Sequence, residues 1–422
     1  MAITVKARSV AIVAIALGAS IALAACSTTS TTSPSSSTSA ASSGLGAPNA
    51  AKGSPVVFGV LNIESGPVTF PEILLAEKAA AAYVNDYKGG IGGHPIKIVS
   101  CVTDGSPSTS ARCANQILDQ KPVAILGAGD TGAPGSIPIY QNAGLAYLGG
   151  IPFTPVEQNY ENAVIFSSIS TADNAAASVY AAKTLGAKSA AVIYTSDTQG
   201  TASAEGAIIP TMKNAGITKI TPIAIAPTAS DVSAAVATAL GASPDVIYVD
   251  APAACPNILN SLKQLGSTAK IVGIDPCTSP AAIKGANGGA EGLYFAAPVE
   301  DPGAGTADTK IYLAALQKYA PASIALDSLA AIGFQSVIDV QAKLAKFSTA
   351  DLTKDKILAA FRAGTDNVNF MGHPYTCDGK QLAGATAVCN SYQQIRQIKG
   401  GVPTVAQAAF VQPGKYYVPQ SH

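Results

Sequence analysis

Charged residues are scarce in this chain, and neither sign dominates. Only 12% of its 422 residues are Asp, Glu, Lys or Arg, and 26 acidic residues balance 26 basic ones. Proteins that bind nucleic acid, or that attach to anionic membranes through charge, carry a clustered basic excess. The composition therefore argues against a nucleic-acid partner and against a polybasic membrane patch.

The usual signatures of catalysis and metal binding are also missing. The sequence has no G-x-S-x-G nucleophile elbow, no H-E-x-x-H motif and no P-loop. Its only histidines are His94, His373 and His422, and no two cysteines have C-x-x-C spacing. We therefore expect no metal, no cofactor and no enzymatic activity. Paired carboxylates such as Asp250 and Asp275 leave a hydrolase as the enzymatic alternative.

Only one long uncharged apolar run occurs, and it lies at the N-terminus. Lys6 and Arg8 precede residues 10–25, which carry no charge, and this order is typical of a secretory signal. The run is short for a spanning helix, which needs roughly 20 residues. We therefore expect residues 1–25 to be a signal peptide and the exported chain to be soluble.

The end of this run resembles the box of bacterial lipoproteins, in which a cysteine becomes the acylated N-terminus. The residues concerned are Leu23 to Cys26. Each buried CH₂ contributes about 0.8 kcal/mol, so a multiply acylated Cys26 would hold the protein at the outer face of a bacterial cell membrane. Residues 26–54, rich in Ser, Thr, Ala, Pro and Gly, then form a flexible tether.

Six cysteines remain when Cys26 is set aside. An even number in an exported chain indicates disulfides, although six cysteines permit 15 pairings. Their grouping along the sequence favours three short-range bonds, which are Cys101–Cys113, Cys255–Cys277 and Cys377–Cys389.

Strand-like and helix-like segments alternate from residue 55 onward. Continuous apolar strands separated by helices predict parallel sheets that are buried on both faces. A first series has strands at 56–62, 96–102, 123–128 and 145–149, and a second has strands at 190–195, 220–225, 245–250, 270–275 and 292–298. We therefore predict an α/β fold with two doubly wound parallel-sheet lobes.

More elements follow these two series. Helical patterns occur at 308–318, 324–347 and 354–363, and the chain ends in a hairpin with strands at 391–398 and near 415–418. These elements follow after both predicted lobes are already complete. We therefore expect the chain to cross between the lobes more than once.

A glycine-rich turn closes the first predicted helix. The segment contains Tyr83-Val84-Asn85, Gly89 to Gly93, Pro95-Ile96 and Asp104. It resembles the first βαβ unit of the type I periplasmic binding proteins, and in particular the branched-chain amino-acid-binding (leucine/isoleucine/valine) receptors of ABC transporters. The resemblance extends over residues 55–400, including the Asp378-Gly379 turn and Gly400-Gly401.

The resemblance implies three crossings between the lobes, near Ser170, residues 298–302 and Leu382. These segments would form a three-segment hinge. Lobe 1 would then comprise residues 55–170 and 302–382, and lobe 2 residues 171–301 and 383–422.

Ligands of open parallel sheets bind outside the carboxyl ends of the strands, so the loops after the strands are the candidate site. Glycines there leave backbone N–H groups free to meet a polar ligand. The candidate ligand-binding residues in these loops are Ala128, Gly129, Asp130, Thr131, Gly150, Ile151, Thr154, Gln199, Asp250, Ala251 and Asp275.

The resemblance assigns roles to two of these residues. It implies that Thr131 binds a ligand carboxylate and that Asp275 meets an α-ammonium group. Charge-assisted hydrogen bonds of this kind are roughly twice as strong as neutral ones and would orient a small zwitterion. The structural alternatives are that Thr131 caps a helix and that Asp275 starts a turn.

Other residues depart from the family pattern. Gln199 stands where relatives commonly carry tyrosine, and Asp130 would repel a carboxylate unless it faces away. Acids recur in the candidate loops, whereas the arginines are expected to lie outside them; they are Arg8, Arg112, Arg362 and Arg396. We therefore favour a neutral or cationic ligand over a dianion, with solvated turn acids as the alternative.

Together these features predict an extracytoplasmic, lipid-anchored receptor. It would capture a small polar ligand, such as an amino acid or amide, by closure of two lobes and deliver it, as a monomer, to the permease of an ABC importer. A ligand-sensing lipoprotein receptor and a structural lipoprotein are the alternatives within the non-enzymatic class.

Overall fold

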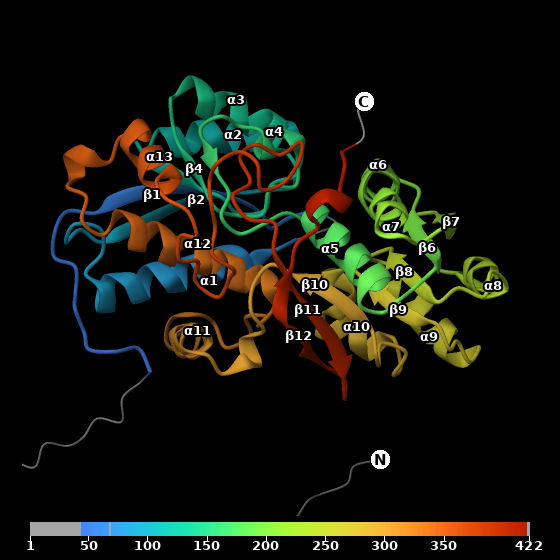
Figure 1. Ribbon diagram of the computed structural model, residues 1–422. Helices are drawn as coiled ribbons and strands as arrows, with labels where there is room; N and C mark the ends of the chain where they lie inside the picture. The colour runs from blue at the N-terminus through green and yellow to red at the C-terminus, as the bar shows by residue number, and fades with distance from the viewer. Residues whose placement is uncertain (1–43, 67–68, 420–422) are drawn as a thin grey trace, which may run out of the picture. The chain divides into compact units, whose positions relative to one another are not determined.

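Two sheets organise residues 44–66 and 69–419, which are the residues that the computed structural model describes (Figure 1). The predicted signal peptide and the predicted lipidation site Cys26 lie outside these residues. Within the described part of the chain, no helix is long and apolar enough to cross a membrane.

The first sheet has five parallel strands in the order β2-β1-β3-β4-β5. Successive side chains of a strand point to opposite faces, and both faces of β1 are covered. Phe58 and Val60 join one apolar cluster, whereas Leu61 joins another. The strands are β1 (Val56–Ile63), β2 (Ile96–Thr103), β3 (Ala124–Leu126), β4 (Tyr147–Leu148) and β5 (Ala163–Val164).

Helices from two distant parts of the chain cover this sheet, and together they form lobe 1. The orange helices α11 and α12 return to the blue helix α1 (Figure 1), and α1 and α12 pack closely. Gly333 permits this approach, because a Cβ there would collide with the carbonyl oxygen of Ile73. The helices are α1 (Pro71–Tyr83), α2 (Pro107–Leu118), α3 (Ala133–Asn142), α4 (Pro155–Gln158), α11 (Ala307–Tyr319), α12 (Ser328–Leu344) and α13 (Lys354–Arg362).

The second sheet has seven strands in the order β12-β11-β10-β9-β8-β6-β7. Five of them are parallel, and β11 and β12 extend the sheet in antiparallel fashion. The strands are β6 (Ser189–Thr195), β7 (Lys219–Ile225), β8 (Val246–Asp250), β9 (Lys270–Gly273), β10 (Tyr294–Ala297), β11 (Gln393–Lys399) and β12 (Val402–Val411). The predicted α/β class with parallel sheets is confirmed.

Helices also cover the second sheet, forming lobe 2 with it. Apolar residues of α5 and α7 belong to one cluster, and those of α8 and α9 to another. The helices are α5 (Ser170–Lys183), α6 (Thr198–Ser203), α7 (Ile209–Ala215), α8 (Ser233–Gly241), α9 (Cys255–Gln264) and α10 (Pro280–Gly285), with a π-helical segment at Ala204–Ile208.

The C-terminal hairpin differs from the prediction. Gly400 and Gly401 have φ values of 60° and 78°, the conformation that a tight two-residue hairpin requires. The partner of β11 therefore starts immediately afterwards, as β12. The strand predicted near residues 415–418 is wrong, since Gly414–Tyr416 is a 3-10 turn.

Three connections join the lobes, after β5, after β10 and before β11. They are tied to one another by hydrogen bonds: Gln393 Nε2 donates to Ser168 Oγ (2.6 Å), and the amide of Asp301 donates to Gln394 Oε1 (2.8 Å). Val388 pairs with Ile165 of lobe 1, so in this structure the third connection follows residue 388 and not Leu382. The lobe boundaries themselves stay a prediction.

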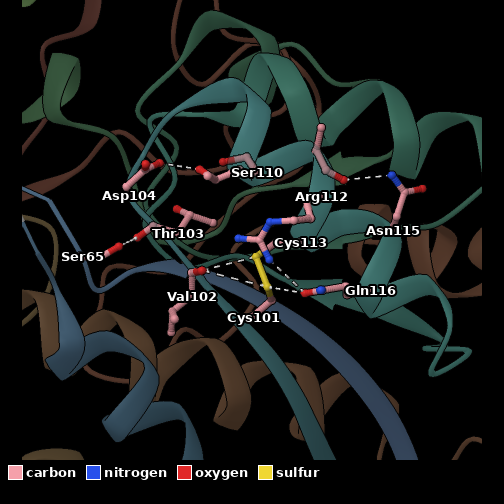
Figure 2. Close-up of a disulfide and its surroundings, with 12 residues drawn as sticks. Ser65, Cys101, Val102, Thr103, Asp104, Ser110, Arg112, Cys113, Asn115 and Gln116 are labelled. Carbon is pink, nitrogen blue, oxygen red and sulfur yellow. Dashed lines mark hydrogen bonds between the residues drawn. A yellow bond between two sulfur atoms is a disulfide. The ribbon is translucent and has the colours of Figure 1, made fainter.

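Three disulfides occur in the described residues, and each joins segments that are close in sequence. They are Cys101–Cys113, Cys255–Cys277 and Cys377–Cys389, as the sequence predicted. Figure 2 shows the first, which fastens β2 to α2 beside Arg112 and Gln116. The second fastens α9 to the turn after β9.

Candidate ligand-binding site

Loops of the two lobes meet at the carboxyl ends of the strands. Asp275 follows β9 of lobe 2, whereas Ser328 begins α12 of lobe 1. The Ser328 hydroxyl lies 3.5 Å from Asp275 Oδ1. This contact places the predicted loops of lobe 2 against lobe 1, and it is the basis for treating the strand ends as one site.

Asp130 is used inside lobe 1. The residue is 4% exposed, and its carboxylate accepts hydrogen bonds from Ser110 Oγ (2.7 Å), Ser136 Oγ (3.0 Å) and the Gly132 amide (2.8 Å). Burial raises the pKa of Asp130, and these donors oppose the shift. The carboxylate of Asp130 is directed at α2 and α3. This is the orientation in which it would not repel a ligand carboxylate.

Neighbouring donors of the β3 loop also have partners. The Thr131 hydroxyl, although its residue is exposed, donates to the carbonyl of Gly105 (3.0 Å). The amide of Gly129 donates to Asn62 Oδ1 (3.2 Å). Two groups that were expected to meet a ligand, Thr131 and the Gly129 amide, are therefore engaged within lobe 1.

The β4 loop shows the same behaviour. The amide of Gly150 donates to Ser336 Oγ (3.1 Å), and the amide of Ile151 donates to the carbonyl of Ala128 (3.1 Å). Ile151 and Ala128 are both buried. These contacts fasten the loop to β3 and to α12, and they leave fewer N–H groups for a ligand than the glycines suggested.

Thr154 caps α4. Its amide and hydroxyl both donate to Glu157 Oε2, at 3.0 and 2.9 Å, and Tyr147 OH donates to Glu157 Oε1 at 3.1 Å. With the Glu157 backbone amide directed at the Thr154 side chain in return, this is a capping box. Burial raises the pKa of Glu157 to about 8, so Thr154 and Glu157 have a structural task in this loop.

An aromatic pair, which sequence reasoning did not identify, lies at the strand ends of lobe 1. Phe70 and Phe153 stack with ring centroids 5.6 Å apart, and both are half-buried. They lie against Gly129, where a Cβ would come within 3.3 Å of each ring. The available signal was the position of both aromatics in loops that follow strands.

Asp250 of lobe 2 contrasts with Asp130. It ends β8 and is 6% exposed, and its Oδ2 has no hydrogen-bond partner among the described residues. Burial raises the pKa of Asp250 to about 6, although the Ser203 hydroxyl opposes the shift. Beside it, Tyr248 OH donates to Asn174 Oδ1 (3.0 Å) and Asn174 Nδ2 donates to Ser203 Oγ (2.7 Å).

Asp275 of lobe 2 interacts with another acid, Asp173. The Asp275 side chain accepts from the hydroxyl of Thr278 (3.2 Å). Burial raises the pKa of Asp275 to about 6, and the positive charge of Arg396 opposes this. Asp173, in the first turn of α5, has its pKa raised by burial and by the charge of Asp275, and its Oδ1 makes no hydrogen bond within the described chain.

Lobe 1 contributes further acids that the sequence reasoning did not select. Burial raises the pKa of Glu72 to about 7, with additional contributions from the negative charges of Asp327 and Glu64. The charge of Asp327 also raises the pKa of Asp275. Glu72 and Asp327 sit at the N-termini of α1 and α12, and that position was the signal that could have identified them.

Arg396 lies in β11, outside the candidate loops as the sequence indicated, but its side chain reaches the start of α12. The guanidinium is buried, with 2% of the residue exposed, and its Nη1 lies 3.4 Å from Ser328 Oγ. Its remaining donors are directed at Gln394 Oε1 (3.1 Å) and the carbonyl of Val299, and Asp301 Oδ2 lies 4.0 Å away. Arg396 thus fastens the connections between the lobes.

The other predicted residues lie as follows. Gln199 is exposed in the first turn of α6, and Ala251 is completely buried after β8. Asp197 caps α6 by accepting a hydrogen bond from the Gly200 amide (2.7 Å). The ligand-binding role of all eleven predicted residues stays a prediction.

Residues 127–132, between β3 and α3, form a G-x-G-x-x-G pattern. In dinucleotide sites the helix that follows this pattern binds a pyrophosphate at its N-terminus. Here the amide of Gly132 donates to the carboxylate of Asp130. A Cβ on Gly132 would collide with the hydroxyl of Ser110. The glycines therefore serve close packing, and the Gly132 amide is engaged by an acid of the same loop.

Two cavities of about 300 and 410 Å³ open on other parts of the surface. Arg362 and the Cys377–Cys389 disulfide line the first, and Lys263 and Lys270 line the second. Neither is lined by any of the eleven predicted residues. Within the described residues, no group of three or more His, Cys, Asp or Glu side chains is placed to hold a metal ion.

Solved structures with the same fold are numerous. A leucine-binding protein from Thermotoga maritima matches with a TM-score of 0.66 and 20% identity, covering 85% of this chain and 99% of its own. A solute-binding protein of an ABC transporter from R. palustris, in complex with 4-hydroxybenzoate, matches with a TM-score of 0.68 and 16% identity, at 85% and 97% coverage. These likenesses confirm the predicted type I fold.

A fatty acid ABC transporter substrate-binding protein from Thermomonospora curvata has a TM-score of 0.69 and 17% identity, covering 87% of this chain and 95% of its own. No curated protein matches the sequence. The family described as periplasmic binding protein matches residues 55–390. With the two-sheet topology, this match shows that the chain belongs to the periplasmic binding protein family.

Proposed function

We propose that this protein is the extracytoplasmic solute receptor of an ABC importer. It captures a small polar ligand between the strand-end loops of its two lobes and presents it to the permease. The observation that carries the proposal is the approach of Asp275 in lobe 2 to Ser328 in lobe 1. Loops at the carboxyl ends of parallel strands are where such sheets bind ligands.

The three connections support closure as the mechanism of capture. A ligand that contacts both lobes favours the closed arrangement by its differential affinity for it. The hydrogen bonds from Gln393 to Ser168 and from Asp301 to Gln394 tie the connections together. They therefore would bend as one hinge and not as three independent linkers.

Attachment and localisation form part of the same proposal. Acylation of Cys26 would hold the receptor, as a monomer, at the outer face of the bacterial cell membrane, with residues 26–54 as its tether. We propose binding without catalysis, which agrees with membership of a family of binding proteins. Replacing Cys26 by alanine should release the protein from the membrane fraction.

A thermal-shift screen of purified protein tests the receptor function. Amino acids, amines, amides, polyols, ureas and small organic acids are compared, because a ligand at one hundred times its Kd adds about 2.7 kcal/mol of apparent stability. Small-angle scattering on each hit then measures the radius of gyration. A hit that reduces this radius is expected, and a screen without any stabilising compound contradicts the proposal.

A further inference from the structure

We propose that the ligand is an organic cation, an amine with an apolar body and no carboxylate. This inference rests on the proposed receptor function and deepens it by naming the ligand class. Three features carry it: the occupied donors of lobe 1, the acids of lobe 2 that have an unpaired oxygen, and the aromatic pair at the strand ends of lobe 1.

Lobe 1 offers little to a carboxylate. The Thr131 hydroxyl donates to Gly105, the Gly129 amide donates to Asn62, and the Gly150 amide donates to Ser336. Water can replace the Thr131 bond, which is exposed, but a ligand carboxylate that displaced Asn62 or Ser336 would leave a buried acceptor unpaired, at a cost of roughly 1–3 kcal/mol each. Recognition of a zwitterion through this wall is therefore disfavoured.

The buried arginine does not replace those donors. Arg396 is directed at Gln394, Ser328 and the carbonyl of Val299, and Asp301 balances its charge. A ligand carboxylate that recruited Arg396 would break the ties between the lobe connections. Arg396 therefore belongs to the hinge and not to an anion site.

Two acids of lobe 2, unlike Asp130 of lobe 1, have a carboxylate oxygen without a partner in the described chain. Asp250 is 6% exposed, and its Oδ2 has no hydrogen-bond partner within the described chain. Asp173 Oδ1 is unpaired as well. Buried carboxylates without partners are costly, and an ammonium group supplies both the charge and the N–H donors that satisfy them.

Further acids lie on both sides of the contact between the lobes. Asp275 approaches Ser328, and Asp327 precedes that serine as the cap of α12. The charges of Asp327 and Asp173 both interact with Asp275, and Asp327 interacts with Glu72. The sum is a run of acidic side chains along the strand ends of both lobes, for which a cation is the complementary ligand when they are ionised.

The aromatic pair defines the rest of the ligand. Phe70 and Phe153 stack at the strand ends of lobe 1 and are half-buried. Such rings favour an apolar group and also attract a nearby cation through their faces. An amine with an aliphatic or aromatic body therefore fits this wall better than a polyol or an amide.

Matched probes that differ only in charged groups test the inference by calorimetry. One series is 2-phenylethylamine, L-phenylalanine and 3-phenylpropanoate; the other is 3-methylbutylamine, L-leucine and 4-methylpentanoate. In at least one series, the amine should bind at least tenfold more tightly than both carboxylate-bearing analogues. Benzamide and isoleucine serve as neutral and zwitterionic references.

Variants identify the responsible acids. Asp250→Asn and Asp275→Asn should each weaken binding of the amine at least tenfold while the fold is retained by circular dichroism. Asp355→Asn is the matched control, because Asp355 is an exposed acid of α13 in lobe 1 with 89% of its side chain accessible. This control should change the amine affinity less than twofold.

Two outcomes overturn the inference, and they differ in what they say about the receptor function. Equal or tighter binding of a carboxylate-bearing analogue, or unchanged amine affinity in both Asp→Asn variants, removes the cation assignment and leaves the receptor function intact. Absence of binding by both probe series and by the whole thermal-shift screen removes both proposals.

Discussion

The strand-end loops of the two lobes occupy equivalent places in equivalent sheets, yet their acids have opposite surroundings. Asp130 in lobe 1 accepts three hydrogen bonds within 3.0 Å. Asp250 in lobe 2 is as deeply buried and has an oxygen without a partner in the described structure. Both acids therefore lie at equivalent strand ends. Their neighbouring side chains decide whether the carboxylate is fully hydrogen-bonded within the fold or keeps an oxygen without a partner.

The largest expected effect is on stability. Asp130→Ala leaves the donors of Ser110, Ser136 and Gly132 unpaired, so the free energy of unfolding should fall by about 3–5 kcal/mol. Asp250→Ala removes a poorly satisfied carboxyl and should not lower the free energy of unfolding by more than about 1 kcal/mol. Urea unfolding followed by circular dichroism measures both.

Equal losses for the two variants would show that the comparison between the lobes is unfounded. The exposed acid Asp355 provides a baseline, since Asp355→Ala should shift the free energy of unfolding by less than about 0.5 kcal/mol.

The disulfides offer a second comparison between the lobes. In the loop-entropy model, the 12-residue separation of Cys101–Cys113 contributes about 2.8 kcal/mol and the 22-residue separation of Cys255–Cys277 about 3.4 kcal/mol. Paired Cys→Ala variants should therefore differ by about 0.5 kcal/mol, with the lobe 2 variant less stable. A reversed order in urea unfolding would mean that local packing outweighs loop closure.

The pH dependence of stability should depend on Asp250. Its pKa is about 6 in the folded protein against 3.8 ordinarily, so the folded state binds the extra proton between these values. Stability contributed by this group is therefore lost as the pH rises from about 4 to about 6, by roughly 1–3 kcal/mol. Asp250→Asn should flatten the unfolding free energy over that window, and an unchanged profile would contradict the shift.

Binding should follow the opposite trend with pH. An amine requires ionised carboxyls, and the pKa values of Asp250 and Asp275 are both about 6. The ionised fraction of one such carboxyl rises about tenfold from pH 5 to pH 7, so the affinity for 2-phenylethylamine should increase about tenfold if one is required and about a hundredfold if both are. Calorimetry at fixed ionic strength measures it, and a decrease over this range would be inconsistent with a cationic ligand.

The smallest expected effects concern Thr131 and Gln199. Thr131→Ala removes one exposed hydrogen bond to Gly105 and should reduce stability by about 0.5–1 kcal/mol. Gln199→Ala should stay within about 0.5 kcal/mol, because the side chain is exposed. If Thr131→Ala instead weakens binding of a carboxylate-bearing ligand tenfold, the family assignment of Thr131 is correct and lobe 1 rearranges on binding.

Periodicity predicted most of the fold, because buried parallel strands such as β1, β6 and β8 are continuous apolar runs. It failed at β12, where Val402–Val411 is half-exposed and rich in alanine, so no apolar run or clear alternation marks it. The adjacent Gly400-Gly401 turn was the better guide, since its conformation fixes where the next strand starts.

The site was less predictable than the fold. The sequence located the loops, but the direction of an acid depends on distant residues: Ser110 and Ser136 draw Asp130 inward. The contacts of Arg396 were unpredictable for the same reason, because its neighbours Ser328 and Val299 are far from it in sequence. Contacts of this kind depend on packing that local patterns do not encode.

The arrangement of the second sheet bears on how the chain can fold while it emerges from a translocation channel. Strand β10 ends at Ala297, and its antiparallel neighbour β11 begins only at Gln393. Until those last residues arrive, β10 is an open sheet edge, which is a template for unwanted pairing. Lobe 1 likewise lacks α12 until residue 344 has emerged. Neither lobe can complete its fold before the C-terminal residues emerge. The chain should therefore need protection from aggregation until then.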